Sequence, residues 1–298
     1  MADLALGAIM AVWGSSFAIL RALLGGAGAQ AAGSPLALVA VRMGLASALL
    51  VAYLALCRRE DLRALLSREL LRDGLFAGGL LGVGFILQIE GLLRTTASRS
   101  GFLTGMLVVL VPLIEFALFR KRPRPPTLLG VLLAFAGMTA LSAPWADSSA
   151  ATLLGDSLTL CCALVFAGQI VLLGRIAARH PLLPLLLLQI ATTGAIAAAA
   201  GPFIEAWQFS NASRLWLALL FLALFATLLA FGVQTWAQRI LPPVRVALLS
   251  ALEPVFAALW AALLIGERLS WRELAGGALI VLGVAVGEAG EALRERIS

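Results

Sequence analysis

The sequence predicts an all-α membrane protein with ten transmembrane helices, arranged as two five-helix repeats that are inserted in opposite orientations. Three observations support this fold class. Hydrophobic residues make up 61% of the chain and charged residues 13%, whereas soluble domains contain about 25% charged residues. Apolar stretches long enough to cross a bilayer follow one another along almost the whole chain. Several residues of the first half also recur at a constant offset in the second half.

Each apolar stretch is bounded by glycine, proline or a cluster of charged residues, which are the residues that end helices. The ten stretches cover residues 3–24, 35–57, 70–93, 97–119, 127–143, 152–174, 181–200, 214–235, 242–265 and 271–290. The connections between them are short, so we expect no domain outside the membrane. Asp3 stands where a secretory signal carries basic residues, and no clean cleavage site follows. We therefore expect the first stretch to remain as a helix.

The lysines and arginines predict the orientation of the chain. Of the 22 basic residues, fifteen lie in one set of alternate connections and six in the other, while Arg42 lies inside the second span. Because cytoplasmic connections are enriched in Lys and Arg, we expect both termini to lie in the cytoplasm. The net charge of +6 is explained by this topology. No soluble basic face exists for a nucleic-acid partner.

Matched residues divide the chain into two repeats, residues 1–146 and 147–298. The pairs separated by 146 positions are Phe85 and Phe231, Gln88 and Gln234, Arg99 and Arg245, Gly130 and Gly276, and Gly137 and Gly283. Each half contains five spans, an odd number, so the two copies have to enter the membrane in opposite orientations. Inverted repeats with interrupted helices at matching positions are typical of secondary transporters, whose substrate site lies at the repeat interface near the midplane.

The span over 242–265 contains a carboxylate and a proline near its middle. Pro254 lies about 16 Å from Pro243 at 1.5 Å per residue, close to half of a hydrocarbon core of about 30 Å. A proline has no N–H to donate and crowds the carbonyl four residues earlier, so we expect a helix kink at Pro254 and a matching one at Pro112. Lipid cannot satisfy a free carbonyl or a carboxylate, so Glu253 is expected to face other helices or a watery cavity.

Two helical faces contain candidate substrate-binding residues. Trp13, Ser16 and Phe17 fall on one face of the first span by spacings of three and four. They either line a cavity or pack against a neighbouring helix.

Glu253, Phe256 and Trp260 share a face of the ninth span. An acid beside two aromatic rings suits an ammonium group attached to an apolar side chain, through charge pairing and cation–π attraction. The alternative is that Glu253 bonds the helix ends beside the kink.

Three glutamines, Gln88, Gln169 and Gln234, lie inside apolar spans. An amide there either binds a substrate or bridges neighbouring helices, which stabilises the protein by about half a kcal/mol. Since Gln88 and Gln234 occupy matching places, cavity lining is the preferred interpretation. Arg42 either anchors a substrate carboxylate or, as we prefer here, snorkels or pairs with a glutamate.

The residue types argue against catalysis and against a bound metal or other cofactor. Cys57, Cys161 and Cys162 have neither a disulfide pattern nor metal-ligand spacing, and His180 is the only histidine. An intramembrane hydrolase needs a nucleophile with a base or a pair of catalytic aspartates. All aspartates lie at or near the ends of spans, and no P-loop is present. We therefore expect no enzyme and no cofactor.

Five segments resemble EamA-type ten-helix members of the drug/metabolite transporter superfamily, over nearly the whole chain. They are WGSSF at 13–17, VAVRMGLASALL at 39–50, TTASRSGFLTGMLVVLVP at 95–112, GDSLTL at 155–160 and LEPVFAALWAALLIGERLS at 252–270. The family's Gly-Glu after helix nine is present as Gly266 and Glu267. The matching turn after helix four reads FRKRPRPP and has no acid, so no role is assigned to an acid there.

Within this family the chain is similar to the bacterial exporters of aromatic and other hydrophobic amino acids, the YddG type. The resemblance implies multi-pass insertion in the bacterial inner membrane and export of small metabolites by alternating access. Sugar phosphates are disfavoured because a phosphate calls for several buried basic residues and only Arg42 qualifies. Drugs or other amphiphilic metabolites are the alternative substrates. Proton coupling through Glu253, uncoupled facilitation, and a monomer or a homodimer built on Gly283 and Gly287 all remain open.

Overall fold

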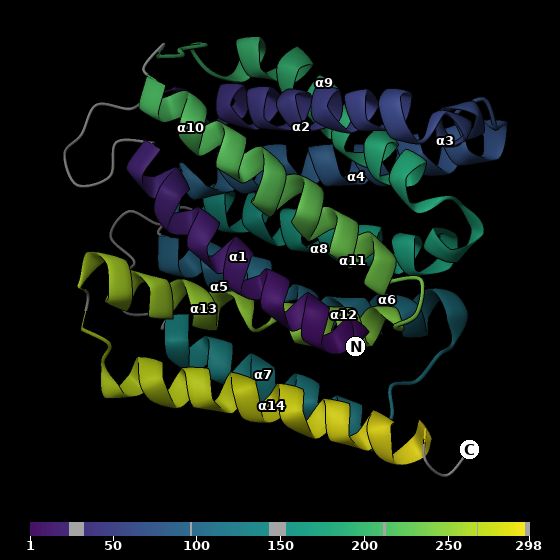
Figure 1. Ribbon diagram of the computed structural model, residues 1–298. Coiled ribbons are helices and arrows are strands. Elements are labelled where there is room, and N and C mark those ends of the chain that lie inside the picture. The colour runs from purple at the N-terminus through teal and green to yellow at the C-terminus, as the bar shows by residue number, and fades with distance from the viewer. Residues whose placement is uncertain (24–32, 96, 143–152, 211–212, 267, 296–298) are drawn as a thin grey trace.

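The computed structural model describes residues 1–23, 33–95, 97–142, 153–210, 213–266 and 268–295. Within these ranges every named element is a helix, and the β contacts amount to an isolated bridge between Gly33 and Phe209. The helices lie roughly side by side as one bundle (Figure 1). Nine helical stretches of the described residues are long and apolar enough to cross a membrane. A shorter apolar stretch, Ala2–Ser16, precedes them, so the tenth span stays a prediction.

The elements follow the predicted spans closely. In chain order they are α1 (Ala2–Leu23), α2 (Pro35–Cys57), α3 (Arg59–Ala64), α4 (Arg68–Leu92), α5 (Ala97–Gly105), α6 (Leu107–Phe119), α7 (Pro125–Ser142), α8 (Leu153–Ile176), the 3-10 turn η2 (Ala177–Arg179), α9 (Leu182–Ile204), α10 (Ser213–Phe221), the π-helix η3 (Leu222–Leu229), α11 (Ala230–Ala237), α12 (Pro243–Ser250), α13 (Glu253–Trp260), the π-helix η4 (Ala261–Ile265) and α14 (Trp271–Glu295). The short α3 and the two π-helical stretches were not predicted.

The ends of several helices have local causes in the sequence. Pro35, Pro125 and Pro243 each begin a helix, where the missing N–H of proline costs no intrahelical bond. At the start of α14 the Ser270 N–H donates to Glu273 Oε2 at 2.7 Å, and the Glu273 N–H donates to Ser270 Oγ at 3.3 Å. This reciprocal arrangement is a capping box.

α7 and α14 pack at one edge of the bundle through glycines (Figure 1). A Cβ placed on Gly137 lies 2.6 Å from the carbonyl oxygen of Gly276, and one placed on Gly283 lies 2.6 Å from that of Gly130. A Cβ on Gly287 meets Leu248 at 2.2 Å. The backbones therefore approach too closely for any larger residue. Gly283 and Gly287, the candidate dimer face, contact Gly130 and Leu248 of the same chain.

Two of the membrane helices are interrupted near their middle. α5 gives way to α6 at Met106, and α12 gives way to α13 at Ala251 and Leu252, whose amides donate to carbonyls only three residues back, at 3.1 Å each. Pro254 follows the second break directly, as predicted. By contrast, α6 runs on through Pro112, so the first break lies before the proline. Met106 and Leu252 are 146 positions apart, the offset of the other matched pairs.

Candidate functional site

Two aromatic pairs lie in the interior of the bundle. Trp13 of α1 meets Phe231 of α11 edge-on with ring centroids 5.3 Å apart, and Phe85 of α4 meets Phe166 of α8 in the same way at 5.7 Å. All four rings pack into one apolar cluster together with side chains of α2 and α9. We call these four residues the aromatic cluster. Edge-to-face packing of this kind is favourable and geometrically specific.

A π-helix positions one of these rings. The indole Nε1 of Trp13 donates to the carbonyl oxygen of Ala226 in η3 at 2.9 Å. A π-helical turn changes the spacing of backbone carbonyls, and such turns are frequent at functional sites. The irregular backbone of η3 therefore supplies the acceptor that holds Trp13 in place.

Arg42 of α2 reaches the aromatic cluster as a buried cation. Its guanidinium carbon lies 5.6 Å from the centroid of the Phe85 ring. The residue is only 9% exposed, and its Nε is buried without a hydrogen-bond partner. Arg42 was expected to snorkel or to pair with a glutamate, and no glutamate pairs with it in the part of the chain that the structure describes. A buried cation without a counter-ion is costly in an apolar setting.

The glutamines fall into two groups. Gln169 Nε2 donates to Gln189 Oε1 at 3.1 Å, and Gln189 Nε2 in turn donates to Thr235 Oγ1 at 3.4 Å. These buried contacts link α8, α9 and α11. Gln169 therefore bridges neighbouring helices, which was the alternative to substrate binding. Gln88 is half-buried and Gln234 buried, and neither side chain makes a hydrogen bond within the described ranges.

The predicted face of the ninth span packs against α1. Trp260 Nε1 donates to the carbonyl oxygen of Ala11 at 2.9 Å. A Cβ on Gly14 would lie 2.9 Å from Phe256 Cβ, so the two helices touch backbone to backbone. Glu253 is half-buried at the first turn of α13 and has no ion pair among the described residues.

The α1 candidates remain close to Trp13. Ser16 Oγ donates to the carbonyl oxygen of Trp13 at 2.7 Å, which leaves the serine oxygen as an acceptor. The side chain of Phe17, like the residue Glu267, lies outside the described residues.

Matching arginines form ion pairs at opposite ends of the bundle. At one end Arg245 of α12 bonds Asp3 of α1 at 2.9 Å and Glu288 of α14 at 2.6 Å. At the other end Arg99 of α5 pairs with Asp156 of α8, which also accepts a hydrogen bond from Thr95 at 2.7 Å. In Figure 1 the start of α1 and the end of α14 lie together, and α5 begins at the opposite end. We call these the terminal end and the α5 end.

The two ends differ in how closely they are packed. In α12 every residue from Pro243 to Leu249 is buried. In α5 and its extension, residues 102–106 are partly exposed, and a Cβ on Gly101 would meet nothing within 4 Å. Ala247, which matches Gly101 at the 146-residue offset, is 0% exposed. α12 is therefore enclosed by its neighbours, whereas α5 keeps one face exposed. In this sense we call the terminal end the closed end and the α5 end the open end.

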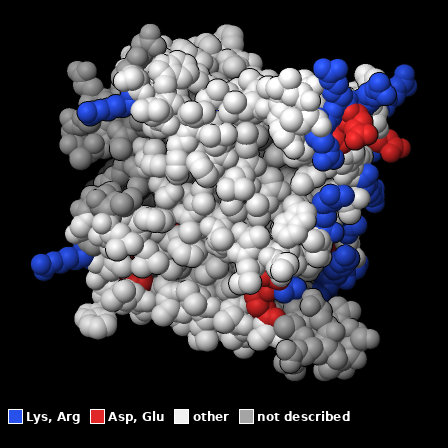
Figure 2. Space-filling model, in the orientation of Figure 1, with Lys and Arg blue, Asp and Glu red and all other residues white. Residues whose placement is uncertain are grey.

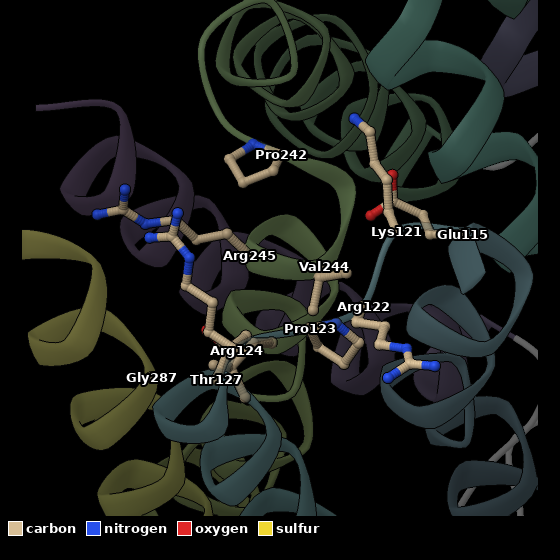
Figure 3. Close-up of a pocket in the computed structure, with 11 residues that line it drawn as sticks. Glu115, Lys121, Arg122, Pro123, Arg124, Thr127, Pro242, Val244, Arg245 and Gly287 are labelled. Atoms are coloured by element: carbon tan, nitrogen blue, oxygen red, sulfur yellow. The ribbon is translucent and has the colours of Figure 1, made fainter. Parts of the chain in front are cut away.

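The terminal end also contains a basic pocket of about 290 Å³. The residues in Figure 3 come from α6, α7, α12 and α14, from the connection between α6 and α7, and from Pro242, which directly precedes α12. Its charged lining residues are Glu115, Lys121, Arg122, Arg124 and Arg245. In Figure 2, Lys and Arg gather at the end where α3 and the end of α14 lie in Figure 1. Basic residues are therefore concentrated at the terminal end.

Comparison with known proteins decides the family. The model of the EamA-like transporter family matches residues 1–143 and again residues 153–286. The chain belongs to the EamA-like transporter family. This family is part of the drug/metabolite transporter superfamily, and it identifies the protein as a multi-pass membrane transporter rather than an enzyme.

Relatives of this EamA-family transporter are mostly named only as transporters. An uncharacterized transporter of Archaeoglobus fulgidus is 30% identical over 287 residues, which are 96% of this chain and 85% of that protein. The uncharacterized transporter YetK of Bacillus subtilis is 25% identical over 67% of this chain and 62% of its own length. A probable terminal-alkyne amino-acid exporter of Streptantibioticus cattleyicolor is 41% identical over 51 residues, 17% of each chain.

A solved crystal structure shares the fold of this EamA-family transporter. Its TM-score is 0.80 at 21% sequence identity, with 96% of each chain covered. At this identity the likeness shows the fold alone. Within the described residues, no group of three or more His, Cys, Asp or Glu side chains is arranged to hold a metal ion.

The phenylalanines of the aromatic cluster in this EamA-family transporter were not predicted as site residues. Phe85 and Phe231 were noted only as a matched pair, and Phe166 was not singled out. The available signal was the repeat itself, because Phe85 and Phe231 lie at the 146-residue offset and both end in aromatic pairs. Trp13 was predicted and lies in the aromatic cluster.

Proposed function

We propose that this protein exports small amphiphilic metabolites across the inner membrane of a bacterial cell, with hydrophobic and aromatic amino acids as the leading substrates. The observation that carries the proposal is the aromatic cluster inside the bundle, with the Arg42 guanidinium over the Phe85 ring and its Nε unpartnered among the described residues. Gln88 and Gln234 follow Phe85 and Phe231 by three residues, and their side chains have no hydrogen bond within the described ranges. Rings suit an apolar side chain, and polar groups suit the charged end of an amino acid. The name of the Streptantibioticus relative supports the same substrate class.

The proposed architecture is an inverted repeat of residues 1–146 and 147–298. The packing of the helices supports it. In the proposed repeat α1 corresponds to α8, α4 to α11 and α6 to α13. In agreement with this, α4 and α6 of the first half pack on α8, and α11 and α13 of the second half pack on α1. α2 pairs with α9, and α7 pairs with α14. These partners occupy equivalent places in the two halves, as a two-fold axis within the membrane plane requires.

The proposed mechanism is alternating access. The concentration of basic residues supports a cytoplasmic terminal end, and the α5 end then faces outward. The structure has the packing expected of an outward-facing state, closed at α12 and open at α5. In the inward-facing state α5 would pack as α12 does here, and α12 would separate from its neighbours.

The substrate-binding residues are also part of this proposal. Trp13 belongs to the aromatic cluster, Gln88 and Gln234 follow two of its rings by three residues, and Ser16 lies one helical turn from Trp13. Glu253, Phe256 and Trp260 lie on the α1 side of α13, where an acid and two rings suit an ammonium group. Phe17 and Gln169 complete the proposed set, although the bonds of Gln169 suit a bridging role as well.

Flux through reconstituted vesicles tests the function. Purified protein in liposomes is expected to exchange labelled phenylalanine and methionine faster than protein-free liposomes, and faster than it exchanges threonine, because the apolar cluster favours apolar side chains. Repeating the assay with an imposed pH gradient separates proton-coupled export from facilitation. A Glu253→Gln protein with unchanged flux and pH response would remove Glu253 from the coupling.

The same vesicles test the alternative substrates. Efflux of a lipophilic cationic dye without any amino-acid flux would replace amino-acid export with drug export. Absence of flux for every solute would contradict the transport proposal itself.

A further inference from the structure

Arg42 lies within the membrane, yet nothing in the described structure neutralises its charge. It is seven residues beyond Pro35, the first residue of α2, which places it about 10 Å into the helix at 1.5 Å per residue. Its Nε is buried and unpartnered, and its guanidinium lies over the Phe85 ring. An aromatic ring attracts a cation but carries no net charge. The site therefore lacks an anion.

The acids on the helices packed around α2 have other described partners or lie far from Arg42 along the chain. Glu205 at the end of α9 accepts hydrogen bonds from the first amides of α2, at 2.9 and 3.1 Å. In α4, Glu90 pairs with Arg94, and Asp73 bonds His180 at 2.9 Å.

The remaining acids near α2 are Glu69 at the first turn of α4, and Glu60 and Asp61 in α3. All three lie beyond the far end of α2, at least fifteen residues from Arg42 in sequence. The charge of Arg42 is therefore left for a ligand to satisfy.

We infer that Arg42 binds the carboxylate of the transported substrate and that the aromatic cluster receives its apolar part. The inference rests on the proposed function and narrows its substrate class. A guanidinium holds a carboxylate through two parallel hydrogen bonds, and the Phe85 ring, whose centroid lies 5.6 Å from the guanidinium carbon, places this cation beside the aromatic cluster. The ligand class is a small apolar or aromatic monocarboxylate. The carboxylate is required and the amino group is not.

Three phenylalanine analogues test this ligand class in the unmodified protein. 3-Phenylpropionate keeps the carboxylate and lacks the amine, whereas phenethylamine keeps the amine and lacks the carboxylate. At equal concentrations, phenylpropionate is expected to inhibit the uptake of labelled phenylalanine and phenethylamine is not. Equal inhibition by both compounds, or inhibition by phenethylamine alone, would overturn the inference while leaving transport intact.

Variants then assign the effect to Arg42. Arg42→Gln is expected to raise the KM for phenylalanine at least tenfold, and Arg42→Lys to raise it less, because lysine keeps the charge but loses the two-pronged geometry. Arg175→Gln is the matched control. Arg175 also lies over a phenylalanine ring, that of Phe119, and its Nε is also buried and unpartnered, but it lies in the last turn of α8. The KM of the Arg175→Gln protein for phenylalanine is expected to stay within twofold of the parent value.

A binding assay separates this inference from the proposed function. If the parent protein moves no amino acid, the proposed function fails, and protection against thermal unfolding in detergent decides the site. Protection by phenylpropionate and not by phenethylamine, lost in Arg42→Gln and weakened in Arg42→Lys, supports the carboxylate site. If Arg42→Gln does not fold, Arg42→Lys and the analogue series decide. An Arg42→Gln protein that discriminates between the analogues as the parent does, or an Arg42→Lys protein that binds phenylpropionate as tightly as the parent does, overturns the inference.

Discussion

α12 and α5 are corresponding half-helices at opposite ends of the bundle, and they are packed very differently. Arg245 and Arg99 occupy matching positions in them, and both helices end at breaks that match at the same offset. Yet Ala247 is 0% exposed, while nothing lies within 4 Å of a Cβ on the matching Gly101. Matching positions therefore differ in burial, because neighbouring helices enclose the apolar α12 and leave one face of the more polar α5 exposed.

The ion pairs of the two ends show the same asymmetry. The Arg245 side chain is 11% exposed and has two carboxylate partners, Asp3 and Glu288. The Arg99 side chain is 26% exposed and pairs with Asp156. Water screens an exposed ion pair more than a buried one. Arg245 is therefore expected to contribute more to the stability of the protein than Arg99. This difference leads to three predictions, which run from the largest effect to the smallest.

The largest effect is expected for removal of the buried arginine. Arg245→Gln leaves Asp3 and Glu288 facing each other without a cation. The cost is expected to be below the roughly 3–5 kcal/mol of a fully buried pair, because the two carboxylates are partly exposed. Thermal unfolding of the detergent-purified variant should show a large fall in melting temperature. Arg99→Gln is the matched control and is expected to lower it less. An equal or larger fall in Arg99→Gln would contradict the asymmetry between the ends.

Cysteine labelling measures the packing of the two half-helices directly. In a background in which Cys57, Cys161 and Cys162 are serine, Gly101→Cys is expected to react at least tenfold faster with a membrane-impermeant maleimide than Ala247→Cys. The physical reason is that a reagent can reach only the open end. Adding Arg245→Gln should raise the labelling of Ala247→Cys when the reagent is applied from the terminal end. Similar rates for both single cysteines would show that the α5 end is closed too.

The smallest effect concerns the glutamines between the two ends. Gln169→Leu removes the 3.1 Å bond to Gln189 and is expected to destabilise the protein by about 0.6 kcal/mol. Gln88→Leu removes no described hydrogen bond, so its melting temperature should stay unchanged while the KM for substrate rises. A stability loss in Gln88→Leu with an unchanged KM would assign Gln88 to packing instead of the cavity.

Much of the fold was predictable because apolar length and helix-ending residues act locally. The helix over Pro35–Cys57 begins at a proline and ends at a charged cluster, and its predicted bounds are confirmed. The kink predicted at Pro112 stays a prediction, and the break at Met106, six residues earlier, was not predicted. A proline removes one intrahelical hydrogen bond, and α6 continues through Pro112 as a helix.

The sequence alone determined the membrane spans, the matched positions of the two halves and the family, because all three depend on composition and spacing along the chain. Only the tertiary structure decided that Arg42 faces Phe85 without a carboxylate, that Gln169 bonds Gln189, and that one end of the bundle is closed. These features depend on which side chains of distant segments meet. Corresponding half-helices such as α5 and α12 can therefore be packed differently although their positions match in sequence.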